Sequence, residues 1–479
     1  MLYRKRIPNE YGEGITMKLN YKRVTLVGMA FFLIMAFWQV YDTIVPLILT
    51  NHFGLSHVAS GVVMSIDNVL AVFLLPMIGA FSDRVDTRWG KRTPFILVGT
   101  VIATVTFVAL TFIDNHQIAS VVAARIPEIA ESGAPEDVIR EMTVELTVAN
   151  PLPFLGFIAT LLVVLVAMSL FRSPAVALMP DVTVGPLRSK ANAVINLTGT
   201  AGGILALALG KLLTSSDNLY MEYTGYVIAV AMVMLAALIV FLISVKEKKW
   251  AKEMEEEALR LGLAETADES NGQKRKLSKS ELTSLLLILA SVALWYIGYN
   301  SITSKYSVYA TNFLGFDLYL TLIVAQVAAI ISYIPVGMIA SKIGRKKTIL
   351  AGVLILATSF LIGHFITPET PEIVMYPIFA IAGIGWATIN VNSFPMAVEL
   401  AKGGDIGKYT GYYYTASMAA QIIAPILAGF LYDLIGMRRV FFLFGTVFVL
   451  FSFVTMLFVK HGDAKVEVKG DLLEQLDVD

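Results

Sequence analysis

Three ionisable side chains interrupt long apolar stretches of this sequence: Asp42, Asp67 and Arg172. A charged group at membrane depth is costly and marks a functional site by default. Trp38 and Gln39 lie four and three residues before Asp42, so an aromatic ring, an amide and an acid share one helix face. A carboxyl group removed from water can bind and release a proton near neutral pH, which makes Asp42 and Asp67 candidate proton carriers. A static acid that fixes helix packing through hydrogen bonds is the alternative for each.

Amide, hydroxyl and aromatic side chains recur at helical spacing in the other apolar stretches. Amides suit the hydroxyl groups of sugars, and Trp and Tyr rings pack against sugar rings. Each of these side chains also suits an interhelical hydrogen bond or an interface aromatic. The candidate substrate-binding residues are Trp38, Gln39, Asn68, Arg172, Asn196, Trp295, Asn300, Trp386, Asn390, Tyr413 and Gln421.

The composition is that of a membrane protein. Of the 479 residues, 56% are hydrophobic and 15% are charged, whereas soluble domains carry about 25% charge. Twelve apolar runs are long enough to cross a hydrocarbon core of ~30 Å as helices. The sequence therefore predicts an all-α membrane protein with twelve transmembrane helices in two pseudo-symmetric six-helix bundles. The predicted spans are 23–50, 57–82, 94–113, 153–179, 191–213, 222–244, 281–311, 317–341, 347–366, 373–397, 408–432 and 439–460.

Basic residues give the predicted orientation. Lysine and arginine concentrate on the cytoplasmic side of membrane proteins. In this chain 30 of the 37 fall on the side that carries both termini, if the spans are as predicted. We therefore expect a multi-pass protein of the cell membrane with both termini in the cytoplasm. Arg438 and Arg439 are exceptions, because they fall in a loop on the other side.

Two connections between the predicted spans are long. Residues 246–280 begin with a charged helical pattern and end in a Ser/Lys-rich stretch. They divide the chain into an N-terminal six-helix bundle over 1–245, a cytoplasmic linker over 246–280, and a C-terminal six-helix bundle with a cytoplasmic tail over 281–479. Residues 114–152 form an acidic outside loop. A solvated loop without a role is favoured there over a short amphipathic helix above the entrance.

Two basic, glycine-centred loops lie about half a chain apart: GAFSDRVDTRWGKRTPF over 79–95 and GMIASKIGRKKT over 337–348. Glycine permits a tight turn between helices, and a carboxylate at a helix end accepts hydrogen bonds from arginine. Such a cluster can latch two bundles together in one conformation and release them in another. Basic residues that only anchor the topology are the alternative. The candidate gating residues are Gly79, Asp83, Arg84, Arg88, Gly90, Arg92, Asp181, Gly337, Gly344, Arg345, Lys346 and Glu399.

A second internal match supports duplication of a half-chain. Asp181 and Glu399 are 218 residues apart, and so are Lys190 and Lys408. A charged loop repeated at matching places in two hydrophobic halves is typical of a duplicated membrane transporter.

The repeated loops resemble those of the major facilitator superfamily. Residues 337–347 are similar to the loop between helices 8 and 9 of that family. The loop over 82–95, SDRVDTRWGKRTPF, is similar to a longer form in sucrose transporters, animal proton-associated sugar transporters and the glycoside–pentoside–hexuronide cation symporters. The resemblance implies two bundles that rock around a central site. In sucrose transporters an arginine of helix 4 binds sugar, and Arg172 stands in a similar setting here.

The chain departs from these families in two places. Residues 161–171 contain no acid, whereas plant sucrose transporters have one in helix 4 upstream of the arginine. Residues 70–81 contain no aspartate, whereas the sodium-coupled symporters have a pair there. Proton coupling is therefore expected rather than sodium coupling.

The sequence thus predicts a secondary active transporter that carries a sugar, a disaccharide or other glycoside, by proton-coupled symport. Efflux of a drug-like or lipid compound and a non-transporting nutrient sensor are the alternatives. Cysteine is missing and the five histidines form no ligand-spaced pair, so we expect no enzyme activity, cofactor or metal site. The expected partners are a small solute, a coupling proton and the lipid bilayer, without nucleic acid, and the chain is expected to be a monomer.

Overall fold

The computed structural model describes residues 5–7, 15–17, 19–184, 187–215, 219–260, 278–401 and 406–462. Apart from connecting turns and a hairpin of two short strands, β1 (Lys5–Ile7) and β2 (Ile15–Met17), this part of the chain is helical. Twelve helices are long and apolar enough to cross a membrane. The predicted number of spans and the all-α class of the membrane part are therefore confirmed.

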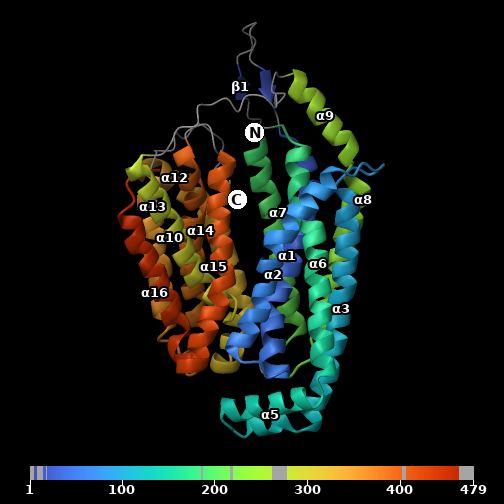
Figure 1. The fold of residues 1–479 in the computed structure, drawn as a ribbon, viewed down its shortest axis with the longest axis vertical. Coiled ribbons are helices and arrows are strands. Elements are labelled where there is room, and N and C mark those ends of the chain that lie inside the picture. The colour runs from blue at the N-terminus through green and yellow to red at the C-terminus, as the bar shows by residue number, and fades with distance from the viewer. Residues whose placement is uncertain are drawn as a thin grey trace.

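The twelve long helices form two bundles that stand side by side (Figure 1). The N-terminal bundle contains α1 (Tyr21–Leu47), α2 (His57–Asp83), α3 (Thr93–Ala123), α6 (Leu152–Asp181), α7 (Arg188–Leu213) and α8 (Thr224–Ser244). The C-terminal bundle contains α10 (Lys279–Thr303), α12 (Leu318–Ile343), α13 (Arg345–Gly363), α14 (Met375–Val398), α15 (Ile406–Ile435) and α16 (Met437–Leu457). Within the first bundle α1 packs on α7 and α3 on α6, and within the second α14 packs on both α12 and α13.

The two ends of the molecule carry different extra helices. One end, here the α9 end, carries α9 (Glu247–Arg260) from the connection between the bundles. The opposite end, here the α5 end, carries α4 (Ile126–Glu131) and α5 (Glu136–Ala149) from the connection before α6. Two further short elements are η4 (Glu372–Val374) and η5 (Glu399–Ala401).

The connection over 114–152 is more ordered than the sequence suggested, so the favoured unstructured loop is wrong. α3 continues to Ala123, ten residues past the end of the predicted span, and α5 forms the amphipathic helix that was the alternative. Both elements persist because their inner faces are buried: Ile139, Met142 and Leu146 of α5 pack against Val121 and the neighbouring apolar residues.

The first helix of each bundle ends in the same unusual way at the α5 end. α1 runs on into a π-helical turn, η1 (Ile48–His52). α10 is followed by α11 (Tyr306–Val308) and then by a second π-helical segment, η3 (Tyr309–Leu314). π-helical turns are rare and occur frequently at functional sites. Their repetition in both halves supports the duplication inferred from the loops.

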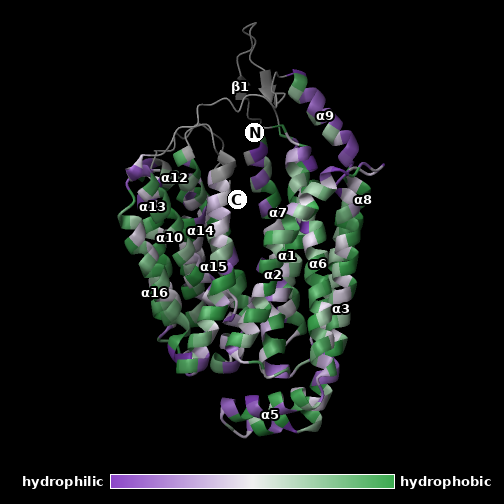
Figure 2. Cartoon of the chain, viewed as in Figure 1, coloured by the Kyte–Doolittle hydropathy of each residue, from purple (hydrophilic) through white to green (hydrophobic). Residues whose placement is uncertain are grey.

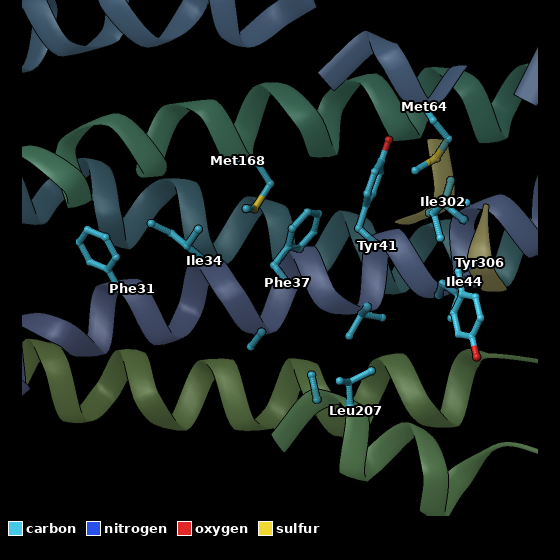
Figure 3. Packing of buried hydrophobic residues seen from close by; sticks show 14 of the residues in the cluster. Phe31, Ile34, Phe37, Tyr41, Ile44, Met64, Met168, Leu207, Ile302 and Tyr306 are labelled. Atoms are coloured by element: carbon cyan, nitrogen blue, oxygen red, sulfur yellow. The ribbon is translucent and has the colours of Figure 1, made fainter. Parts of the chain in front are cut away.

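The surface and the core have the properties that a bilayer requires. Large apolar side chains such as Phe73 and Ile243 are 70% and 74% exposed along the flanks. Figure 2 shows that hydrophilic residues gather at the two ends, including α9 and α5. Inside the N-terminal bundle, Phe31, Ile34 and Phe37 of α1 face Met168 and other buried residues (Figure 3). Helices pack in lipid through such close contacts, because lipid itself provides no hydrophobic drive between them.

Candidate functional site

Asp42 lies on the face of α1 that looks into the space between the bundles. It is exposed to solvent although it lies well inside the helix, and Met35, two turns earlier on the same face, is 39% exposed. Trp38 and Gln39 of this face are half-buried. Water therefore reaches the middle of α1. The predicted acid, amide and aromatic group lie together on this face, which is here called the central site.

Arg172 and Asp67 join the central site from α6 and α2. The guanidinium of Arg172 lies over the Trp38 ring, 5.7 Å from its centroid. It interacts electrostatically with Asp67 and, more weakly, with Asp42. Asn68 donates a hydrogen bond of 2.8 Å to Asp67. A single cation beside two carboxylates can pair with either of them or with a polar ligand between them.

Aromatic rings of the C-terminal bundle face this cluster. The Tyr299 ring of α10 lies near Asp42, close enough to interact with its charge. It stacks on Trp386 of α14 at 6.0 Å and 29°, and Tyr333 of α12 approaches the same indole at 6.4 Å. Here we call these three rings the aromatic wall. Of them only Trp386 was predicted from the sequence.

A hydrogen bond between two glutamines connects the bundles at the central site. Gln326 of α12 donates from its amide nitrogen to Oε1 of Gln39. Sequence reasoning missed Gln326. The signal was an amide alone in the apolar run LIVAQVAAIIS, residues 322–332, because polar groups as well as charged ones are costly inside a membrane.

The other predicted substrate-binding residues lie in two settings. Asn68, Asn196, Asn300 and Gln421 are half-buried, and Asn300 donates to the Tyr296 carbonyl of its own helix at 2.8 Å. Trp295, Tyr413 and Asn390 are 1%, 3% and 9% exposed, so they are packed within the C-terminal bundle. In this conformation they therefore present little surface to a solute.

At the α5 end, a carboxylate of one bundle caps a helix of the other. Both oxygens of Asp433, near the end of α15, accept hydrogen bonds from the first backbone N–H groups of α2, at His57 and Val58, each at 2.9 Å. Arg140 of α5 lies 3.7 Å from the same carboxylate. A negative charge at a helix N-terminus is favourable, because it meets unpaired N–H groups and the positive end of the helix dipole.

Further ionisable groups are buried among the helices, Lys305 and Asp114 among them, which corrects the sequence-based count of three. Lys305 is fully buried after α10 and donates to the Ser60 hydroxyl of α2 at 2.5 Å. Asp114 is fully buried because α3 extends past the predicted span, and it lies 2.7 Å from Nδ1 of His52. Lys305 lies just past the end of α10 and Asp114 just past the end of the predicted span, where polar loops and buried polar contacts cannot be told apart by hydropathy.

Two more pairs join the bundles at the α5 end. Asn51 of η1 and Asn312 of η3 exchange amide hydrogen bonds of 3.1 and 2.7 Å. Lys211 of α7 forms an ion pair with Asp317, which precedes α12. These contacts lie between the ends of helices that are equivalent or neighbouring in the two halves.

Close backbone packing completes the contact at this end. A side chain at Gly429 of α15 would place its Cβ 2.5 Å from the His57 carbonyl oxygen. One at Gly61 of α2 would place it 2.3 Å from the Pro425 carbonyl oxygen. The two helices therefore touch backbone to backbone, which only glycine allows.

At the α9 end, the predicted gating charges pair within each bundle. Arg92 binds Asp83 and, at 2.8 Å, Asp181. In the C-terminal bundle Arg345 binds Glu399. The two clusters are equivalent by the internal repeat, and the part of the chain that the structure describes shows no ion pair between them. The predicted charges thus come together, but in this conformation they do not latch one bundle to the other.

The other predicted gating residues have separate roles. Arg84 and Arg88 are exposed, and Arg88 lies over the Trp89 ring. Lys346 donates to the carbonyl groups at the end of α16, at Leu457 (2.8 Å) and Val459 (2.6 Å). Three of the remaining ones are glycines: Gly79 lies next to Ser173, Gly344 has φ +94° before α13, and Gly337 lies within α12.

Glu247 at the start of α9 anchors the connection between the bundles, and sequence reasoning did not identify it. Its carboxylate accepts from the backbone N–H groups of Lys91, Arg92 and Thr93 at 2.7–2.8 Å and from the Thr93 hydroxyl at 2.7 Å. Gly90, at φ +115°, makes room for this carboxylate, since a Cβ there would lie 2.2 Å from it. α9 is thus fixed to the N-terminal bundle.

Two protein-family models match the sequence of this chain. The model described as Major Facilitator Superfamily matches residues 142–417 and 322–474. The chain belongs to the major facilitator superfamily. A second model, described as MFS/sugar transport protein, matches residues 26–126. No curated protein sequence matches the chain.

Solved structures of this superfamily have the same fold. The inward open xylose transporter XylE from E. coli aligns with a TM-score of 0.60 and 14% identity over 95% of this chain and 99% of its own. A bacterial homologue of the iron transporter ferroportin, in an inward-facing state, gives 0.58 and 13%, over 92% and 99%. A mutant of the nucleoside transporter NupG gives 0.58 and 14%, over 91% and 100%. At such identities the likeness shows the fold alone.

The family and the fold are those of membrane transporters, and a sugar-related solute fits the second family model. Among the described residues, no group of three His, Asp or Glu side chains is arranged to hold a metal ion.

Proposed function

We propose that this protein is a proton-coupled symporter of a sugar, a disaccharide or other glycoside, and that it works by alternating access. The observation that carries the proposal is the central site. A water-accessible acid, Asp42, lies beside a cation and an indole of one bundle and faces the aromatic wall of the other. Proton binding and solute binding would then occur within one space that both bundles enclose.

The proposed orientation places the α9 end in the cytoplasm, because the basic residues concentrate there. In that orientation the present conformation is inward-facing. The cross-bundle contacts of Asp433, Asn51 and Lys211 close the outer side, while Asp42 is exposed to water. The solute would leave toward the cytoplasm from this state.

Asp42 is the proposed proton carrier. Its carboxylate is negative when it faces the cytoplasm, where it releases its proton, and it accepts a proton when the site opens outward. A neutral carboxyl group can cross between the two states at lower cost than a charge, because fewer polar contacts must be replaced. Asp67, held by Asn68, is the second candidate.

Arg172 and the aromatic rings are proposed to hold the sugar. A guanidinium offers several donors in one plane to ring and hydroxyl oxygens. Trp38 on one side and the aromatic wall on the other present flat, amphipathic faces to a pyranose ring.

The test is uptake by purified protein in lipid vesicles. Radiolabelled sucrose, maltose, melibiose and lactose are supplied with an imposed inward proton gradient, and protonophore and sodium serve as controls. The proposal expects accumulation of at least one sugar that the protonophore abolishes and sodium does not restore. With the Asp42→Asn variant, accumulation should be lost while exchange of labelled for unlabelled sugar persists. Transport of a cationic dye instead of any sugar would favour export of a drug-like compound.

A further inference from the structure

The two amide pairs that join the bundles differ in how completely their hydrogen bonds are used. Asn51 and Asn312 donate to each other in both directions, and Asn51 also reaches the Leu219 carbonyl. Gln39 and Gln326 share a single hydrogen bond. An amide has two donor hydrogens and an acceptor oxygen with two lone pairs, so the glutamine pair keeps unused capacity.

The unused groups of the glutamine pair lie side by side. Gln39 retains its whole –NH₂ group and Gln326 retains its carbonyl oxygen, since among the described residues neither group has a hydrogen-bond partner. Both side chains are half-buried rather than sealed in the interior. A donor and an acceptor are therefore available next to each other at the central site.

Gly203 of α7 packs against this pair. A Cβ at this position would lie 3.4 Å from Oε1 of Gln326 and 3.8 Å from Oε1 of Gln39. The α7 backbone thus lies against the two amide oxygens on one side of the pair, and a solute must approach from the other side. On that side lie Asp42, one helical turn from Gln39, and Tyr333, two turns from Gln326 on the same face of α12.

A donor beside an acceptor is complementary to two neighbouring hydroxyl groups. One hydroxyl oxygen can accept from the Gln39 amide while the adjacent hydroxyl donates to Gln326 Oε1. We propose that Gln39 and Gln326 recognise a vicinal diol of the solute, one hydroxyl from each bundle. This inference rests on the proposed function as a sugar transporter and names the part of the sugar that the site reads.

Recognition by one residue from each bundle would couple binding to the conformational change. α1 and α12 belong to different bundles, so opening of the α5 end separates Gln39 from Gln326. A bound diol can satisfy both amides over a longer span than the direct hydrogen bond allows. A solute without the diol would leave the two amides unpaired once the bundles separate, and sites built to hydrogen-bond a hydroxyl discriminate strongly against a ligand that lacks it.

The test measures sugar binding by the purified full-length chain in nanodiscs, from quenching of tryptophan fluorescence by sucrose, maltose, melibiose and lactose. Gln39→Met and Gln326→Met remove the amides at nearly constant volume, and each is expected to weaken binding roughly tenfold. Asn312→Leu is the matched control, because it removes the saturated amide pair away from the central site. It should leave the selectivity described next unchanged.

Monodeoxy analogues of the sugar that binds complete the experiment as a double-mutant cycle. Removal of the hydroxyl that pairs with Gln326 should cost wild type roughly tenfold in affinity and cost Gln326→Met less than about twofold. Wild-type affinity in both methionine variants, or equal losses for every deoxy analogue in wild type and variants, would overturn the inference alone. Absence of binding by all four sugars would overturn it together with the proposed function.

Discussion

The two ends of the molecule use the same kinds of residue in opposite ways. At the α5 end, charged and amide groups pair between the bundles: Asp433 with the start of α2, Asn51 with Asn312. At the α9 end, the charges pair inside each bundle, as with Arg92 and Asp181 or Arg345 and Glu399. The α5 end is therefore joined across the interface, whereas these charges of the α9 end pair within their own bundle.

This difference identifies what must change when the site opens to the other side. The cross-bundle contacts at the α5 end have to break, and their cost must be met by new contacts at the α9 end or by the solute. Ion pairs inside a bundle need not break for the bundles to move as units. The following changes are expected to shift this balance.

Because the chain contains no cysteine, the substitution Ser65→Cys, buried between α2 and α15, provides a single reporter thiol.

The largest effect is expected from Gly429→Ala. The new Cβ would overlap the His57 carbonyl, so the closed α5 end should lose about 2 kcal/mol, or roughly thirtyfold in population, as in overpacked cores. The loss of the closed state is measured as faster labelling of the reporter thiol by a water-soluble maleimide. Gly411→Ala, in the same helix with nothing near its Cβ, is the control. Equal labelling of both variants would show that contact at Gly429 does not hold this end closed.

Glu247→Gln tests the other end. The amide nitrogen of glutamine would face backbone N–H donors, so the free energy of unfolding should fall by about 2 kcal/mol. Labelling of the reporter thiol should not change, because the contact lies within one bundle. Thermal unfolding in detergent measures the first result, with the exposed Glu256→Gln on the same helix as control. A variant as stable as wild type would contradict the anchoring role.

Asp433→Asn should have a smaller effect on the closed end. The substitution keeps the shape of the side chain but removes the negative charge that caps α2. The lost charge should destabilise the closed end by about 1 kcal/mol, so labelling should be about fivefold faster. Asp86→Asn, an exposed aspartate at the α9 end, should leave labelling unchanged. If both variants label alike, the cap does not contribute to closure.

The smallest effect is expected from Arg140→Ala. Its ion pair with Asp433 is 3.7 Å long and the arginine side chain is 41% exposed, so about 0.5 kcal/mol, or a twofold change in labelling, is expected. An effect as large as that of Asp433→Asn would mean that α5, rather than the cap, holds the end closed.

The fold could be predicted further than the site because the two depend on different information. Hydropathy and the basic loops determine the spans, whose ends agree with the structure to within three residues except at α3. α3 continues through a polar turn because Asp114 and Gln117 find buried partners in η1 and α5. Such partners lie far away in the sequence, so hydropathy ends the helix too early.

Site residues on one helix face were predictable, whereas partners from the other bundle were not. Trp38, Gln39 and Asp42 share a face by spacing alone, and the structure places them together. Gln326 and Lys305 acquire their significance only from contacts across the interface. Conversely, Trp295 had the right type and spacing but faces the interior of its own bundle.

The most direct test of proton-coupled sugar transport is sugar-driven proton movement by the wild-type protein. Vesicles without a gradient, loaded with a pH-sensitive dye, receive the sugar that gave uptake, and the internal pH is followed. Symport predicts internal acidification in step with sugar entry, absent with Asp42→Asn and collapsed by a protonophore. Sugar entry at wild-type rate with no change of pH would contradict proton coupling through Asp42.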